Sequence, residues 1–156
     1  MARRFTPAYM QLVWAVNGRR CLIHPAWREE VEAMLVWWLN HYKHESIAVR
    51  CMPDHTHALF KYHPTQSISK LVMVMKGETT KFIKGRGWCD DMDWQDGYGL
   101  FTYRKSDVPV VKAYVQNQDA HHAEDYRFRQ EYIDMLAAAE VEYEEWMLFE
   151  DMVDWV

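Results

Sequence analysis

Two short motifs, far apart in the chain, carry the side chains that could do chemistry. His55 and His57 alternate along a predicted strand, so both imidazoles point to the same face of a sheet. Tyr114 and Gln118 are four residues apart on a predicted helix, which also places them on one face. Together these side chains would form a divalent-metal site with a phenol beside it. That combination is suited to cutting a phosphodiester bond through a covalent phosphotyrosine.

The ligand types restrict which metal such a site would hold. Imidazole nitrogens from His55 and His57 favour Mn, Fe, Co, Ni, Cu or Zn, whereas Mg prefers oxygen. The side-chain carbonyl of Gln118 would add an oxygen ligand and extend the range to Mg and Mn. A lone His-x-His pair is more often two half-exposed histidines than a metal site, and a lone Tyr-x-x-x-Gln pair occurs in helices by chance. The interpretation therefore depends on the two motifs occurring together.

The elements that must position these residues follow from periodicity and turn signals. β-forming residues predict strands over residues 9–16, 47–52, 55–62 and 98–103. Helical periodicity and capping residues predict helices over residues 25–44, 67–83, 107–118 and 129–140. Pro53-Asp54 predicts the tight turn of a hairpin from which the histidine strand starts. The order β-α-β-β-α-β is typical of an α+β fold of the ferredoxin-like or RRM-like kind. We expect an antiparallel sheet with helices on one face, and an additional C-terminal helix that carries Tyr114.

Composition places the chain among cytoplasmic, single-domain proteins. A length of 156 residues, 49% of them hydrophobic, predicts one domain over residues 1–156. No apolar run is long enough for a membrane helix, and the N-terminus does not resemble a secretory signal. The three cysteines, Cys21, Cys51 and Cys89, are widely spaced and form no C-x-x-C motif, which argues against a disulfide framework or a zinc knuckle.

The formal net charge of −5 argues against a nucleic-acid partner until its distribution is considered. Residues 137–156 hold seven acids and no base, so an acidic tail from about residue 140 accounts for the negative total. The remaining chain carries a small positive excess. The candidate DNA-contacting residues are Lys70, Lys76, Lys81, Lys84, Arg86 and Arg104. An ordinary solvated helix face explains the same charges equally well.

The chain resembles the single-tyrosine (Y1) HUH transposases of the IS200/IS605 insertion-sequence group. The resemblance is carried by residues 12–16 (LVWAV), 52–57 (MPDHTH) and 114–118 (YVQNQ), and it extends over about residues 9–146. Residues 130–132 and 143–145 resemble that family's C-terminal helix and tail. Thr56 stands where a bulkier aliphatic residue is usual, and we expect its side chain to point away from the metal face.

This resemblance implies a specific activity. His55, His57 and Gln118 match residues that hold a divalent metal, with Mg or Mn expected. Tyr114 matches the nucleophile, which attacks single-stranded DNA, forms a 5′-phosphotyrosine bond and releases a 3′-hydroxyl, without a nucleotide cofactor. Members of the family are homodimers that recognise DNA hairpins near the ends of the mobile element, as single strands. In active members the tyrosine helix of one subunit can complete the histidine site of the other.

Two other functions stay open on the sequence. One is a non-catalytic or domesticated relative that binds nucleic acid on an open sheet face, and the other is a nickase that acts on chromosomal repeats. The adjacent His121 and His122 suggest a second metal site, but adjacent side chains diverge on regular structure, which favours polar surface or DNA contact. Aromatic residues at Trp88, Trp94, Tyr98 and Phe101 could stack on bases, although a role in covering the core is favoured.

Overall fold

Four antiparallel strands form a single sheet at the centre of the computed structural model, which describes residues 3–19, 22–119 and 128–148. The strand order is β2-β3-β1-β4, with β1 at the centre paired to β3 on one side and to β4 on the other. The strands are β1 (Tyr9–Ala15), β2 (Glu45–Cys51), β3 (His55–Lys61) and β4 (Gly99–Tyr103). This order and the alternation of strands and helices confirm the predicted α+β, ferredoxin-like class.

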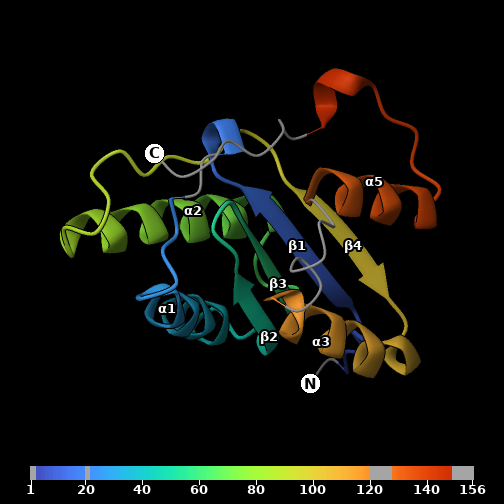
Figure 1. The fold of residues 1–156 in the computed structure, drawn as a ribbon. Coiled ribbons are helices and arrows are strands. Elements are labelled where there is room, and N and C mark those ends of the chain that lie inside the picture. Colours follow the sequence, from blue (N-terminus) through green and yellow to red (C-terminus); the bar gives the residue numbers. More distant parts are fainter. Residues whose placement is uncertain (1–2, 20–21, 120–127, 149–156) are drawn as a thin grey trace.

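The helices lie where their periodicity predicts them, with ends that differ from the predicted ones by one to three residues. They are α1 (Arg28–His41), α2 (Ile68–Gly85), α3 (Val108–Gln116) and α5 (Phe128–Ala138), as Figure 1 shows. Ser67 caps α2 by accepting a hydrogen bond from the backbone N–H of Lys70. Pro109 occupies the first turn of α3, where the missing N–H costs nothing. None of the helices in the described part of the chain is long and apolar enough to cross a bilayer.

The side chains of β1 alternate between two different packing layers. Leu12 and Trp14 pack into a core with α1 and α2, whereas Val13 and Ala15 face α5. On the same side as α5, Val115 of α3 packs on the sheet in a second small cluster. The second face of the sheet, which we expected to be open, therefore carries α3 and α5, and these two helices can bring side chains to it.

The turn between β2 and β3 fixes the direction of the histidine strand. The Met52 N–H donates to the His55 carbonyl at 2.8 Å, and the Asp54 carbonyl accepts from the Val16 N–H at 2.9 Å. Thr56 pairs with Trp14 in the sheet register, and its hydroxyl donates weakly to the Cys51 sulfur on the α1 and α2 side. The expectation that Thr56 points away from the histidine face is confirmed.

A methyl group at Gly99 would clash with this packing. A Cβ atom there would lie 2.6 Å from the Tyr132 hydroxyl, 2.8 Å from its ring and 2.9 Å from the ring of Phe101. Because both rings are buried in the cluster beneath α5, we expect Gly99→Ala to lower the free energy of unfolding by about 1–3 kcal/mol. Chemical denaturation of purified protein measures this change.

Gly77 supplies a matched control for that substitution. It lies inside α2, and a Cβ atom there would meet nothing within 4 Å. Gly77→Ala should therefore raise the free energy of unfolding by about 0.5–1 kcal/mol, because alanine favours the helix. Equal effects of the two substitutions would contradict the packing described for β4 and α5.

Candidate active site

His55 and His57 lie on β3 and face the α3 and α5 side of the sheet. His57 pairs with Val13 and His55 with Ala15, so both imidazoles share a face with residues that pack on α5. Both side chains are buried, with at most 1% of their surface exposed. The Phe128 ring stacks on the His55 ring at a centroid distance of 3.9 Å and an interplanar angle of 3°. The period-two prediction for this motif is confirmed, and the pair is enclosed by α5.

A hydrogen bond at Nδ1 orients each imidazole. Asp54 lies with Oδ1 2.8 Å from His55 Nδ1, and Gln11 lies with Oε1 2.6 Å from His57 Nδ1. The Gln11 amide is itself oriented, because its Nε2 donates to the Tyr103 hydroxyl at 2.7 Å. Since both partner oxygens can only accept, each Nδ1 carries the proton and donates it. The Nε2 lone pairs are then left to bind a metal, which is the usual arrangement of metal-ligating histidines.

Glu131 of α5 brings a carboxylate to these two nitrogens. Its Oε1 lies 2.9 Å from His57 Nε2 and 3.9 Å from His55 Nε2, and ligand atoms of the three residues all lie within 4.8 Å of one another. The side chain is 1% exposed. Two neutral nitrogens and one anionic oxygen form a donor set that fits a divalent cation.

Sequence reasoning did not identify Glu131 as a site residue. A signal was present, because Glu131 lies at helical spacing among the residues by which α5 packs on the sheet, Phe128, Tyr132 and Met135. A single acid on the apolar face of a helix is unusual and often marks a function. Gln11 carried no comparable signal, since one glutamine in a strand has many ordinary uses.

Burial determines the charge state of one of the two histidines. Desolvation lowers the pKa of His55, and the opposing attraction of Asp54 does not compensate for it. At neutral pH His55 is therefore a neutral imidazole, the form that can donate a lone pair to a metal.

Tyr114 reaches the same face from α3. Its ring centroid lies 6.2 Å from that of His57, with the two planes at 84°. Val115 next to it is buried against Ala48 and Leu59, and this contact holds α3 on the sheet. The structure therefore brings Tyr114 beside the histidines within a single chain.

Gln118 lies just beyond the end of α3. The helix ends at Gln116, and Asn117 follows as its C-cap. The Gln118 side chain is fully buried, and its Nε2 donates to the Tyr114 carbonyl at 3.3 Å. This bond uses the amide nitrogen, so it is compatible with the predicted use of the amide oxygen as a ligand. His121 and His122 lie outside the described residues.

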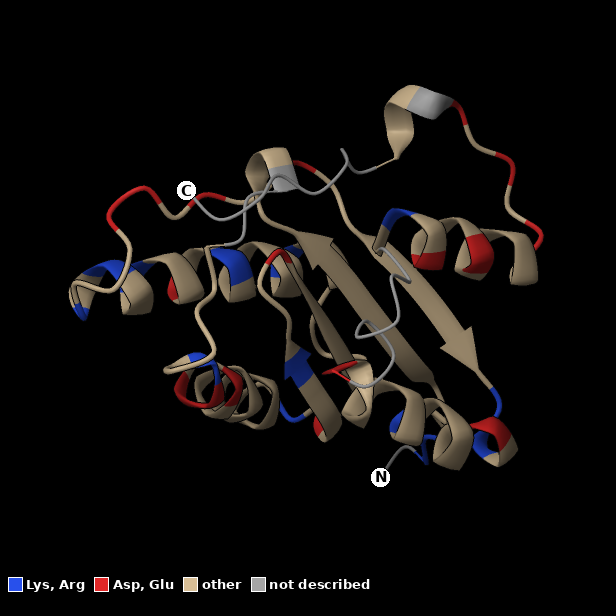
Figure 2. Ribbon diagram, viewed as in Figure 1, with Lys and Arg blue, Asp and Glu red and all other residues tan. Residues whose placement is uncertain are grey.

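The predicted basic strip lies on the opposite layer from the histidines. Most of its residues project from α2, which packs on the other face of the sheet, and Figure 2 shows blue segments along that helix. Lys76 donates to the carbonyls of Gln95 and Gly97 at 2.9 and 2.8 Å, so it holds a loop. Arg86 contacts Glu30 at 3.7 Å, whereas Arg104 follows β4 close to α3 and is 85% exposed.

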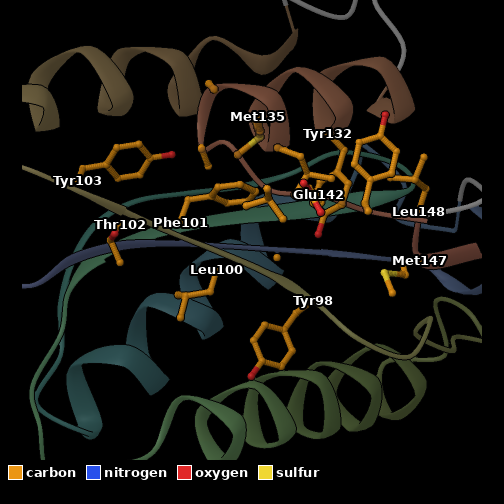
Figure 3. A pocket seen from close by; sticks show the side chains of 16 residues that line it. Tyr98, Leu100, Phe101, Thr102, Tyr103, Tyr132, Met135, Glu142, Met147 and Leu148 are labelled. Carbon is orange, nitrogen blue, oxygen red and sulfur yellow. The ribbon is translucent and has the colours of Figure 1, made fainter. Parts of the chain in front are cut away.

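A groove runs along β4 and not over the histidines. It has a volume of about 740 Å³ and lies between this edge strand and the segment from α5 to Leu148. Figure 3 shows Tyr103, Phe101 and Tyr132 following one another along it. The groove adjoins the site through Tyr103, which holds Gln11, and through Tyr132, the neighbour of Glu131. Trp94 and Phe101 are buried, which agrees with their expected role in covering the core.

Comparison with known proteins gives one family and two informative structures. The family model described as "Transposase IS200 like" matches residues 5–118. A crystal structure described as a candidate transposase from Deinococcus radiodurans R1 is similar, with 19% identity, a TM-score of 0.58, and coverage of 76% of this chain and 96% of that one. A structure described as the REP-associated tyrosine transposase bound to a REP hairpin is similar at 14% identity and the same TM-score, with coverage of 78% and 73%. No curated protein matches the chain at a significant level.

Proposed function

This chain belongs to the IS200-like transposase family, and we propose that it cleaves and rejoins single-stranded DNA through a covalent bond between Tyr114 and a 5′-phosphate. The observation that carries the proposal is the convergence of two oriented imidazoles, the Glu131 carboxylate and the Tyr114 ring on one buried face. A purely structural pair of histidines would not need a hydrogen bond at each Nδ1 and an anion at Nε2.

A divalent metal would be held by His55, His57 and Glu131, with Gln118 as the further ligand that the sequence motif suggests. When bound, such an ion polarises phosphoryl oxygens and aligns the phosphate for in-line displacement. The combination of nitrogen and oxygen donors supports Mn, and the oxygen donors extend the range to Mg.

Tyr114 would supply the nucleophile. A phenol with an ordinary pKa near 10 is only about one part in a thousand ionised at neutral pH, so the reaction must remove its proton. The phenolic oxygen forms a bond to phosphorus, the bond from phosphorus to the 3′-oxygen breaks, and the leaving 3′-oxygen takes up a proton. The phosphotyrosine keeps the energy of the broken linkage, so a 3′-hydroxyl can reverse the step and no nucleotide cofactor is needed.

The substrate we propose is single-stranded DNA that carries hairpins, acted on by a homodimer. A similar structure is described as bound to a REP hairpin, and the sequence resemblance implies the same kind of substrate and the same oligomeric state. Arg104 is the candidate contact nearest to α3. Lys70, Lys81, Lys84 and Arg86 would contact a part of the DNA that passes along α2, on the other side of the sheet.

End-labelled DNA tests this proposal directly. Single-stranded oligonucleotides from the DNA that flanks the gene would be incubated with the purified chain and Mg or Mn. We expect 3′-labelled strands to migrate with the protein on a denaturing gel, and 5′-labelled strands to be released as shorter products. Chelator should abolish both products, and the same sequence as a perfect duplex should give neither.

Binding without any metal-dependent cleavage would contradict the proposal. That outcome would favour the non-catalytic, nucleic-acid-binding relative. Cleavage confined to chromosomal repeat hairpins would instead support the repeat-associated nickase.

A further inference from the structure

Asp119 connects the end of the tyrosine segment to two arginines from other elements. Arg28 of α1 donates from both terminal nitrogens to the Asp119 carboxylate, at 2.7 Å each. Arg50 of β2 forms a second ion pair with the same carboxylate. Asp119 directly follows Gln118 and lies five residues beyond Tyr114. The three-way contact therefore joins three elements close to the candidate active site.

The two arginines are themselves held in position. Arg50 pairs with His57 in the sheet register, and its side chain also contacts Glu32 of α1 at 3.7 Å. Glu32 in turn accepts a hydrogen bond from the Cys51 N–H at 2.9 Å. With two arginines and two carboxylates the cluster is electrically neutral, so both arginines already have anionic partners, which argues against a vacant phosphate site.

α3 is held on the sheet by a small apolar cluster, in which Val111 and Tyr114 are half-buried beside the buried Val115. The helix is nine residues long, and Val115 is its only buried residue. A helix of that length is unstable on its own and depends on packing contacts. The apolar contact of Val115 lies near its C-terminal end, and the ion pairs of Asp119 are the next anchor along the chain.

We propose that Asp119 is a positioning residue that clamps the C-terminal end of α3 to Arg28 and Arg50 of the same subunit, and so holds Tyr114 beside that subunit's own histidines. The expected effect on catalysis rests on the proposed function, whereas the restraint of α3 by Asp119 does not depend on it. A bidentate contact between arginine and a carboxylate restrains direction as well as distance, which a positioning contact requires.

Hydrogen exchange tests the clamp independently of activity. In Asp119→Asn we expect the amides of α3 to exchange about tenfold faster, whereas the amides of β1 and β3 keep their rates. Asp107→Asn is the matched control, because Asp107 precedes the same helix and is as exposed as Asp119, but it pairs with the exposed Arg104, at 3.4 Å, and not with a largely buried arginine. Unchanged exchange across α3 in Asp119→Asn would overturn the proposal, as would an equal acceleration in the control.

Adduct formation tests the catalytic consequence. At saturating DNA and Mn, the single-turnover rate should fall about tenfold in Asp119→Asn and recover substantially in Asp119→Glu, which restores the charge. Saturating Mn keeps the metal site filled in all three proteins, so the comparison does not depend on the contribution of the adjacent Gln118 to Mn affinity. A rate that does not fall would contradict the positioning role. If the wild-type chain forms no adduct at all, the proposed function fails, and the exchange measurement still decides whether the clamp exists.

Discussion

Tyr114→Phe should lose the covalent DNA adduct, with a fall in the single-turnover rate of at least about a thousandfold. Phenylalanine fills the same space beside His57 but has no oxygen to bond to phosphorus. The measurement is the amount of 3′-labelled strand that migrates with the protein on a denaturing gel over time. DNA binding by the variant should stay close to that of the wild type, because one hydroxyl contributes little to a contact dominated by phosphates.

Tyr98→Phe is the control for the loss of a phenolic hydroxyl. Tyr98 lines the groove beside β4 and is 39% exposed, away from the paired imidazoles. The Tyr98→Phe variant should form the DNA adduct at the wild-type rate. An undiminished adduct in Tyr114→Phe would assign the nucleophile to another tyrosine and would remove the central residue from our proposal.

Glu131→Gln should weaken Mn binding by at least about a hundredfold, because it replaces an anionic ligand by a neutral one of the same shape. Calorimetric titration of the purified chain measures this affinity without any DNA. Adduct formation at limiting Mn should fall in parallel and should recover in part at high Mn concentration. Thermal unfolding in the presence of chelator shows whether the variant is folded before metal is added.

Gln118→Ala distinguishes the contribution of Gln118 to metal binding from that of Glu131. If Glu131 is the main anionic ligand, Gln118→Ala should reduce the affinity for Mn by a smaller factor, about tenfold. Full affinity in Glu131→Gln together with lost affinity in Gln118→Ala would contradict the carboxylate assignment. It would support the ligand set that the sequence motif alone suggests.

The sequence predicts the local parts of this site well. Two histidines at a spacing of two must share a face of a strand, and Pro53-Asp54 sets where that strand begins. Tyr114 lies on a helix whose start is indicated by Asp107 and Pro109. These predictions depend only on periodicity and turn chemistry, which act over a few residues.

Features that depend on the packing of distant segments could not be predicted in the same way. Glu131 is 74 residues from His57 in the sequence, and only the placement of α5 across the sheet brings the two together. The ion pairs of Asp119 join residues separated by 69 and 91 positions. The positive charges of the basic strip were evident from the sequence, but the face of the sheet on which α2 packs could not be predicted from it. Lys76 was predicted as a DNA contact for this reason, whereas its ammonium group donates hydrogen bonds to backbone carbonyls.

Gln11 connects three strands of the sheet through its side chain. From β1 it contacts His57 on β3 and Tyr103 on β4, and it is 1% exposed. The Gln11 hydrogen bonds, made between paired strands, therefore fix the direction of the His57 lone pair, so this part of the proposed metal site needs no ion to form it. In contrast to a zinc finger, whose chain folds around its metal, a scaffold of this kind would keep its backbone shape while one cation replaced another in the proposed site. The metal ion bound in the cell would then depend on the concentrations of the available ions and on how fast they exchange, and not on a folding step.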